Sequence, residues 1–524
     1  MGARYQADPP LRHPAVAIPR WLRYGVDRPE EEHMGDAWRQ LIEHMKRIDT
    51  LSNIHAVLHW DQQTGMPPAA GKARGEQSAA LAGLVHDLQV DPRLTEWLGA
   101  VDPAGDDVKQ AAVRNLGRTI QRASRVPKAL VERRARLESE GFSAWMEARH
   151  DRDFARFAPV LQELIDTSIE RAQAIDDTRA PYDVLLEDFD PGTTTADLDP
   201  MFARLRDGLH QLVDAVRELP TPAAVRDVVS DDIQLTWHRD LLEALGYDFS
   251  SGAMAKSAHP FTIRLGPSDV RITTRILEDD VLAGLGGTVH EGGHAMYEQG
   301  LPDLPGTGVG AAASMGMHES QSRFWENFIG RSRPFFGWAV ERLQACGGPG
   351  LDADRLYRSA NRIQPDVIRV EADEVTYNLH IIVRYELEQG LFRGDLAVAD
   401  LPDAWNERYR KLLGVEVPDV ARGVLQDVHW ASGAFGYFPS YTLGNLYAAS
   451  FGVAIEEAVP DLWADVAEGR FERVLAWLRE QVHTQGHKHD SPELMRRVVG
   501  DRDHVEDLLA YLWGRHGALY GVER

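Results

Sequence analysis

The sequence contains a single cysteine and no long hydrophobic run. Cys346 stands alone among 524 residues, so the chain cannot form an internal disulfide or a zinc site of several thiolates. Such cysteine usage is typical of a reducing compartment, and we expect a cytoplasmic protein. No segment reaches the roughly 18 consecutive apolar residues that a membrane span requires. The N-terminal segment also lacks the apolar core of a secretory signal, so we expect no membrane association.

Basic residues are in short supply. There are 57 lysines and arginines against 81 aspartates and glutamates, which gives a formal net charge of −24. A field of this sign repels nucleic acids and anionic membrane surfaces, so we expect neither as a partner. An anionic ligand would need arginine side chains placed directly in its binding site.

Most of the chain has the apolar spacing of helices. Trp38, Leu41, Met45 and Ile48 recur at intervals of three and four residues, as they would on one face of a helix. We expect one mainly α-helical domain, residues 34–524, preceded by a poorly ordered extension, residues 1–33. Similar spacing predicts helices through much of the C-terminal third and, before it, at about 73–98, 107–122, 127–149 and 153–176.

One segment has the alternation of a β-strand instead. Val270, Ile272, Thr274 and Ile276 alternate with charged or polar residues, which is a period of two. A second short apolar segment precedes them across a Gly-Pro-Ser-Asp turn. These features predict a two-stranded hairpin, and thus a small sheet, just before the helix that carries the next motif.

The segment GTVHEGGHAMYE, residues 287–298, contains the H-E-x-x-H pattern of helical zinc sites. Positions i and i+4 lie one turn apart on one helix face, so His290 and His294 can bind the same ion. Glu291 is placed to take a proton from a water on that ion. Gly292 and Gly293 each disfavour a helix by about 1 kcal/mol relative to alanine. We expect them to leave a bare face, where the substrate groove narrows, that another segment or a substrate can approach.

A catalytic zinc site needs a third protein ligand, and the histidines alone are also compatible with a polar helix surface. The longer H-E-x-x-H-x-x-G-x-x-H form is excluded, because a tyrosine and a glycine occupy its glycine and third-histidine positions. Glu298 is too close on the same helix to wrap around the ion. Glu319 follows His294 by 25 residues, which leaves room for a loop and a returning helix. We predict Glu319 as the third ligand, with Glu326 as the alternative.

Six short motifs, taken in order, resemble the carboxypeptidase Taq family of metallocarboxypeptidases. They are HPF (259–261), DVRIT (269–273), HEGGH (290–294), HESQ (318–321), IRVEAD (368–373) and GVLQDVHW (423–430). The resemblance extends from about residue 36 to the C-terminus. It implies a large two-lobed helical body with a deep substrate groove, and a homodimer that removes single amino acids from the free C-terminus of peptides with broad specificity.

The resemblance also implies site residues and an ion. The implied ligands are His290, His294 and Glu319, Glu291 is the implied catalytic base, and the ion is Zn²⁺ or alternatively Co²⁺, one per subunit. His318 and Gln321 flank Glu319 and are predicted to support the metal ligands without binding the ion, and the sequence leaves the orientation of Glu319 itself open.

A C-terminal exopeptidase has to recognise a carboxylate, for which arginine provides a planar fork of donors. Arg369 is the first candidate, and we expect it on a helix with Asp373 at i+4, placed to hold its guanidinium. Arg271 on the predicted hairpin is the second, and either arginine is also compatible with an ordinary surface position. Further polar residues that we predict to bind substrate or orient a neighbour are Gln426, His429 and Tyr441.

Two other functions fit the same pattern. An oligopeptidase or dipeptidyl-carboxypeptidase would use the same chemistry in a similar groove. A non-catalytic peptide-binding protein would keep the groove without turnover, but the intact ligands and Glu291 disfavour it. Peptides with an amidated C-terminus distinguish the first alternative, because an exopeptidase that binds the free carboxylate fails on them.

Overall fold

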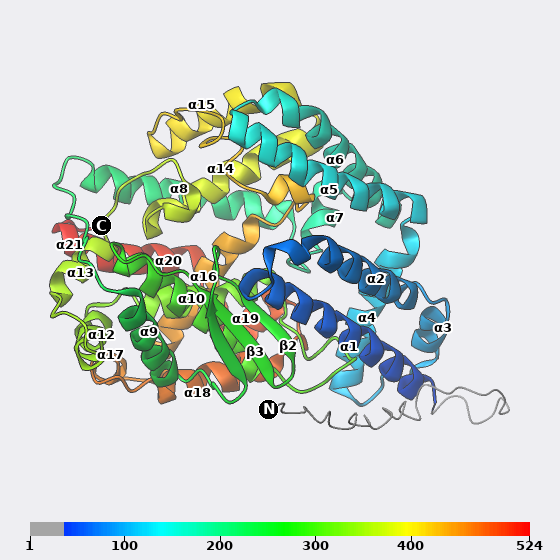
Figure 1. The fold of residues 1–524 in the computed structure, drawn as a ribbon, viewed down its shortest axis with the longest axis horizontal. Coiled ribbons are helices and arrows are strands. Elements are labelled where there is room, and N and C mark those ends of the chain that lie inside the picture. Colours follow the sequence, from blue (N-terminus) through cyan, green and yellow to red (C-terminus); the bar gives the residue numbers. More distant parts are fainter. Residues whose placement is uncertain (1–35) are drawn as a thin grey trace, which may run out of the picture.

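Helices make up most of the computed structural model, which describes residues 36–524 (Figure 1). The mainly α-helical prediction is therefore confirmed. The extension predicted at residues 1–33 lies outside the described residues. Within the described part of the chain, no helix combines the length and the apolar content needed to traverse a bilayer.

The N-terminal helices match the predicted segments with one break. The segment predicted as a single helix at 73–98 is two helices. Pro92 lacks an N–H and restricts the residue before it, so one helix ends ahead of it and the next begins after it. The side chains of Asp106 and Asp153 cap two of these helices by accepting backbone N–H bonds. The six helices are α1 (Ala37–Thr64), α2 (Gly71–Gln89), α3 (Arg93–Ala100), α4 (Asp107–Arg125), α5 (Lys128–Asp151) and α6 (Phe154–Ile175).

Helices α1 and α2 pack against each other at the surface of the molecule. Helix α2 has no buried residue. The second half of α1 contacts the sheet through the rings of His59 and Trp60, which meet the ring of Phe261 edge-on. The buried residues of α1 all lie in its first half, at Ala37, Leu41, His44 and Ile48.

The rest of the chain forms the larger helical body. Almost every residue of its central helix, α14, is buried, and α16 packs on α14, α11 and α20. Its helices are α7 (Pro181–Leu186), α8 (Thr195–Val216), α9 (Asp231–Leu245), α10 (Val281–Gly300), α11 (Met315–Arg323), α12 (Arg333–Ala345), α13 (Ala353–Ala360), α14 (Glu374–Arg393), α15 (Leu401–Leu413), α16 (Pro439–Ala458), α17 (Leu462–Ala467), α18 (Glu472–Gln481), α19 (Ser491–Val499), α20 (His504–Leu512) and α21 (Ala518–Tyr520).

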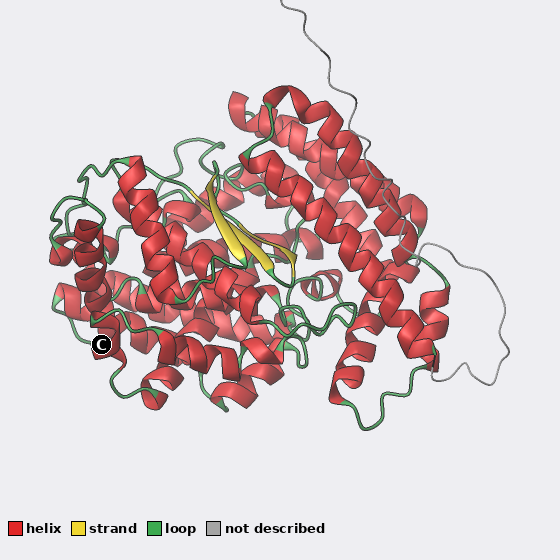
Figure 2. Cartoon of the chain, turned by 60° about the horizontal axis from the view of Figure 1, so that its bottom comes forward, coloured by secondary structure: helices red, strands yellow, loops and turns green. Residues whose placement is uncertain are grey.

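The sheet has three strands rather than the predicted two, and helices surround it (Figure 2). Strands β2 (Thr262–Gly266) and β3 (Asp269–Thr274) form the predicted antiparallel hairpin, with Thr262 opposite Ile272. Strand β1 (Gly252–Lys256) pairs with β3 in parallel and completes the order β1-β3-β2. The sequence of β1, GAMAK, contains no β-branched or aromatic residue, which explains why it gave no strand signal.

The sheet and α11 position helix α10, which carries the H-E-x-x-H motif. The side chain of Asp280 caps α10 by accepting the N–H of Ala283. Helix α10 packs on β2, β3, α9 and α11, and α11 packs in turn on α16. Val270 and Ile272 of β3 are fully buried in the main core. The motif helix is therefore held on several sides by rigid elements.

Candidate active site

Helices α10 and α11 bring His290, His294 and Glu319 together. One donor atom from each residue lies within 4.8 Å of the other two. The Oε2 atom of Glu319 is 3.4 Å from Nε2 of His294 and 3.8 Å from Nε2 of His290. Two imidazoles and one carboxylate are the donor set of catalytic zinc sites, and they also suit Co²⁺. The residues therefore fit a divalent ion.

Glu326, the alternative ligand, has a different position. Its Oε2 atom lies 2.8 Å from Nδ1 of His290, so it accepts the Nδ1–H of the imidazole and leaves Nε2 free for an ion. It is not part of the cluster of converging donor atoms. The geometry thus favours Glu319 as the ligand and assigns Glu326 to the orientation of His290.

Whereas a hydrogen bond to Glu326 orients His290, stacking against another ring holds the imidazole of His294. It lies 4.3 Å from the ring of His318 at an angle of 22°, and Nε2 of His318 bonds to Oε1 of Glu298 at 3.0 Å. The buried Nδ1 of His294 has no hydrogen-bond partner among the described residues. His318, predicted to support the metal ligands, thus contacts the ligand His294.

The side chain that does hold Glu319 is Arg323, one turn further along α11. Its Nε donates to Oε1 of Glu319 at 2.6 Å. Gln321, predicted as a supporting partner of the metal site, makes its side-chain hydrogen bonds to Ser320 and His483.

These contacts determine the charges in the cluster. Burial opposes ionisation of Glu319, but the guanidinium of Arg323 and the neighbouring histidines hold the pKa of Glu319 well below its usual range. Burial also opposes ionisation of Glu326, but Arg323 and His290 outweigh it and lower the pKa of Glu326 to about 2. Burial lowers the pKa of His294 to about 3, so its imidazole is neutral and keeps a lone pair for a metal.

The two glycines of the motif lie against other helices. A Cβ atom on Gly292 would lie 2.4 Å from Cδ2 of Leu242 on α9. A Cβ on Gly293 would lie 2.6 Å from the carbonyl oxygen of Gln321 on α11. The bare face therefore admits neighbouring protein segments, and the expectation that it faces a narrowing substrate groove is wrong. A Cβ on Gly444 of α16 would likewise lie 2.5 Å from Cγ of Glu319.

Glu291 is fixed by strand β2. The hydroxyl of Thr262 donates to Oε2 of Glu291 at 2.7 Å and also contacts its carbonyl oxygen at 2.9 Å. Burial raises the pKa of Glu291 above its ordinary value. Thr262 was not predicted, although its place at the start of the predicted hairpin was a usable signal.

A second buried cluster surrounds Arg369. This residue lies in a 3₁₀ turn, Arg369–Glu371, and not in an α-helix. Its Nε and Nη2 both donate to Oδ1 of Asp427, at 3.0 and 2.8 Å. Asp373, predicted to hold this guanidinium, instead caps α14 by accepting the N–H groups of Val375 and Thr376. Asp427 was not predicted, although it lies in the GVLQDVHW motif.

The cluster contains two guanidinium groups for one carboxylate. Arg384, fully buried on α14, donates through Nε to Oδ2 of Asp427 at 2.7 Å. Among the described residues, neither arginine pairs with any other carboxylate. Burial lowers the pKa of His429, which lies nearby, to about 4, so its imidazole is neutral. One positive charge is therefore left without a partner.

Three of the predicted substrate-binding residues lie in this second cluster. Gln426 accepts the backbone N–H of Arg369 at 2.9 Å. His429 bonds to the hydroxyl of Tyr441 at 3.2 Å, and the guanidinium of Arg369 lies 5.0 Å from the ring of Tyr441. Arg271 lies elsewhere, paired with Asp269.

One tyrosine ring joins the two clusters. The hydroxyl of Tyr377 accepts a bond from Nη1 of Arg369 at 3.0 Å. The guanidinium of Arg323, which holds Glu319, lies 4.5 Å from the centre of the same ring. The cluster of His290, His294 and Glu319 and the cluster around Arg369 are thus linked through two side chains, Arg323 and Tyr377.

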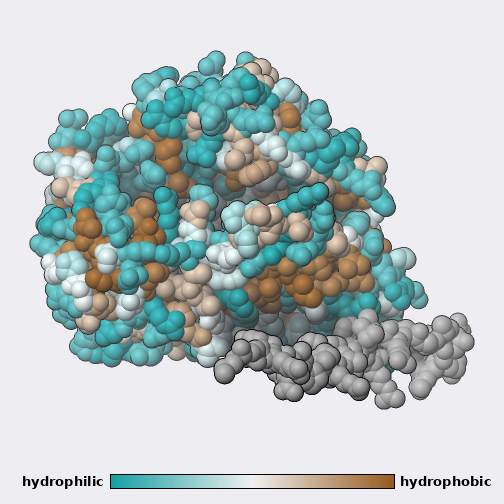
Figure 3. All heavy atoms as spheres, viewed as in Figure 1, coloured by the Kyte–Doolittle hydropathy of each residue, from teal (hydrophilic) through white to brown (hydrophobic). Residues whose placement is uncertain are grey.

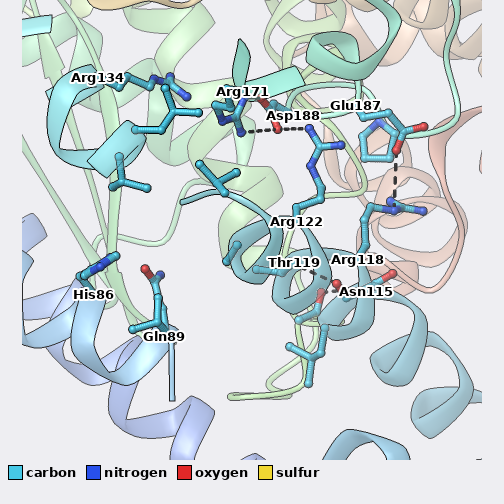
Figure 4. Close-up of a pocket in the computed structure, with 18 of the residues that line it drawn as sticks. His86, Gln89, Asn115, Arg118, Thr119, Arg122, Arg134, Arg171, Glu187 and Asp188 are labelled. Atoms are coloured by element: carbon cyan, nitrogen blue, oxygen red, sulfur yellow. Dashed lines mark hydrogen bonds and ion pairs between the residues drawn. The ribbon is translucent and has the colours of Figure 1, made fainter. Parts of the chain in front are cut away.

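A hollow of about 680 Å³ lies between α2, α4 and α5. The surface in Figure 3 is hollowed between the segments of α2 and α5, and most of that face is polar. In the hollow, Arg122 and Arg171 both bind Asp188 (Figure 4). The ring of Phe189, next in the chain, contacts Tyr437, and its carbonyl oxygen accepts the N–H of Met315 at the start of α11. None of the three converging ligands lines this hollow.

Known proteins of one family are similar to this chain over most of its length. The model of the family described as carboxypeptidase Taq (M32) metallopeptidase matches residues 40–516. Thermostable carboxypeptidase 1 of Thermus thermophilus is 42% identical over 507 residues, covering 93% of this chain and 99% of the relative. Carboxypeptidase 1 of Bacillus subtilis is 36% identical over 492 residues, covering 92% and 98%. The crystal structure of the M32 carboxypeptidase from Deinococcus radiodurans has a TM-score of 0.88 at 38% identity, covering 93% of this chain and all of that chain.

Proposed function

The chain belongs to the carboxypeptidase Taq (M32) family of metallopeptidases, and we propose that it removes single amino acids from the free C-terminus of peptides with broad side-chain specificity. The metal ligands in this proposal are His290, His294 and Glu319, and the ion is Zn²⁺ or Co²⁺. When bound, such an ion lowers the pKa of a coordinated water and polarises the scissile carbonyl.

Glu291 is the proposed catalytic base. It lies next to His290 on the motif helix, and the hydroxyl of Thr262 fixes its Oε2 atom. Because burial raises its pKa, this carboxylate accepts a proton from the attacking water more readily than an exposed glutamate. It then delivers that proton to the nitrogen of the leaving amino acid, so it acts first as a base and then as an acid.

The unpaired positive charge of the arginine cluster carries the proposal that the enzyme is an exopeptidase. A buried charge without a partner is costly, and a peptide's terminal carboxylate would balance it. Arg369 has N–H groups left for such a ligand after its bonds to Asp427 and Tyr377. Arg323 and Tyr377 link this cluster to the ligand Glu319, and this proximity supports a terminal carboxylate bound close to the scissile bond.

Strand β2 supports broad specificity. It pairs with β3 along one edge only, and Thr262 of β2 contacts the catalytic base. An extended peptide that adds to the other edge is held by main-chain hydrogen bonds, which do not depend on its side chains. His429 and Tyr441 are proposed as further donors to the oxyanion or to the terminal carboxylate.

Three expectations accompany this function. The family resemblance supports a homodimer, and the single cysteine supports a cytoplasmic location. We also propose that residues 34–524 act as one domain.

The test is a mass-spectrometric reading of peptide digests. The metal-loaded enzyme, given a mixture of free-acid peptides and their C-terminal amides, should produce ladders of single-residue steps from the free acids and leave the amides intact. Steps of two residues would indicate a dipeptidyl-carboxypeptidase, and internal fragments an oligopeptidase. The absence of any product would favour the binding-protein alternative.

A further inference from the structure

The guanidinium of Arg323 bonds to two carboxylates, the proposed ligand Glu319 and its neighbour Glu326. Its Nε donates to Oε1 of Glu319 at 2.6 Å and its Nη1 to Oε2 of Glu326 at 3.3 Å. The ring of Tyr377 covers it at 4.5 Å, and only 13% of the side chain is exposed. Arg323 is therefore fixed by two carboxylates and an aromatic face at once.

Arg323 occupies one particular oxygen of Glu319. The other oxygen, Oε2, faces the histidines at 3.4 and 3.8 Å. The hydroxyl of Ser322 also lies 3.3 Å from Oε2, but its shorter bond, at 2.7 Å, goes to the carbonyl oxygen of Glu319. With Oε1 engaged by a charged donor, Glu319 has only Oε2 left to offer an ion.

The same guanidinium also constrains Glu326. Oε2 of Glu326 receives both Nη1 of Arg323 and the Nδ1–H of His290, the latter at 2.8 Å. Oε1 of Glu326 faces Arg331, whose Nη2 lies 3.4 Å away. Without Arg323, Glu319 would lose the charged donor that engages Oε1, and this second oxygen could turn towards the ion.

We propose that Arg323 is a positioning residue that gives two neighbouring carboxylates separate roles. It limits Glu319 to a single ligating oxygen and keeps Glu326 as the acceptor for His290. Fewer protein donors on the ion leave more of its coordination sphere open to water and substrate, as a catalytic site requires. The inference rests on the metal centre of the proposed function and concerns how that centre is shaped.

The experiment compares Arg323→Lys with Arg331→Lys. Both changes keep the positive charge and replace a planar fork by a single ammonium. Both affect a contact to Glu326, but only Arg323 touches Glu319. Each purified protein is loaded with Co²⁺, whose visible absorption weakens as its coordination number rises, and its Co²⁺ affinity is measured by competition with a chelator.

For Arg323→Lys we expect a weaker and shifted absorption band and a loss of Co²⁺ affinity of about 10-fold or more, as is typical when a partner of a metal ligand is changed. For Arg331→Lys we expect the wild-type band and an affinity within about twofold of wild type. An unchanged band and affinity in Arg323→Lys would overturn the proposal. Equal changes in both variants would also overturn it, because they would indicate a general effect of charge or packing.

Two further measurements keep the result interpretable. If Arg323→Lys does not fold, as judged by circular dichroism, Arg323→Gln replaces it with the same expected change in the band. The spectra do not depend on peptide cleavage. An enzyme without C-terminal ladders but with the expected Arg323 effect would refute the proposed function alone, and the reverse result would refute the inference alone.

Discussion

Two buried clusters of this molecule present groups of opposite character. Around α10 and α11, two imidazole nitrogens and a carboxylate oxygen converge. Around Asp427, two guanidinium groups share one carboxylate. The first arrangement suits a cation and the second suits an anion. The contacts between them run through Arg323 and Tyr377. In the proposed function a single peptide terminus engages both clusters, which would account for the arginines at this place in an acidic protein.

The largest effect on activity is expected beside the cluster of His290, His294 and Glu319. Glu291→Gln removes the proton acceptor and leaves all three ligands in place, so kcat should fall by about 10³-fold. The metal content, measured by atomic absorption, should stay at wild type. A kcat within about tenfold of wild type would mean that another group serves as the base.

The variant Arg369→Met tests the arginine cluster around Asp427. Asp427 then keeps Arg384 as its partner, so the charges balance and the protein should fold. Loss of the bond to the terminal carboxylate should lower kcat/KM on free-acid peptides by about 10²-fold, equivalent to roughly 3 kcal/mol. Metal content should again be unchanged.

The control for that variant is Arg271→Met, the other arginine indicated by the sequence. Arg271 is paired with Asp269 and makes no contact with Asp427. Its replacement should change kcat/KM by no more than about threefold. If Arg271→Met shows the larger loss, the assignment of the terminal carboxylate to Arg369 is wrong.

A smaller effect, on stability rather than on activity, is expected at the contact between α10 and α11. In Gly293→Ala the new Cβ would lie 2.6 Å from the backbone oxygen of Gln321, which forces α10 and α11 apart. We expect a loss of about 1–3 kcal/mol in the free energy of unfolding, seen as a lower Tm. Gly287→Ala on the same helix is the control, since its Cβ would lie 3.7 Å from Pro260 and should be neutral or slightly stabilising. Equal Tm values would show that the contact is not tight.

The smallest effect concerns pH and His429. Burial lowers the pKa of this histidine from 6.5 to about 4, so the unfolded chain binds a proton at a higher pH than the folded protein. Its contribution to stability is complete above pH 6.5 and is lost as the pH falls towards 4. Between pH 8 and 5.5, denaturant titrations of His429→Gln should lose about 1 kcal/mol less stability than wild type. An identical pH profile would contradict the buried, neutral state of His429.

The sequence was sufficient for the parts of the fold and site that follow a regular period. The helical spacing, the alternation of β3 and the i, i+4 histidines each gave the correct element. The spacing to Glu319 gave a residue that the fold does bring to the histidines. These features depend on neighbours along the chain, and such neighbours are visible in a sequence.

The features that the sequence missed depend on contacts between distant segments. Asp427 holds Arg369 from 58 positions away, whereas Asp373, at the helical spacing, caps a helix instead. Thr262 reaches Glu291 from a different strand. Strand β1 depends on pairing with β3 rather than on its own residues. No local period encodes such partners, so only the fold identifies them.

Helix α2, which buries no side chain, gives the molecule an uneven resistance to local opening. Its backbone amides should exchange with deuterium far faster than those of α14, where almost every residue is buried. The free energy that separates α2 from an open form is only a small part of the global stability. A protease could therefore cut within residues 71–89 while the ligand cluster and the arginine cluster remain folded.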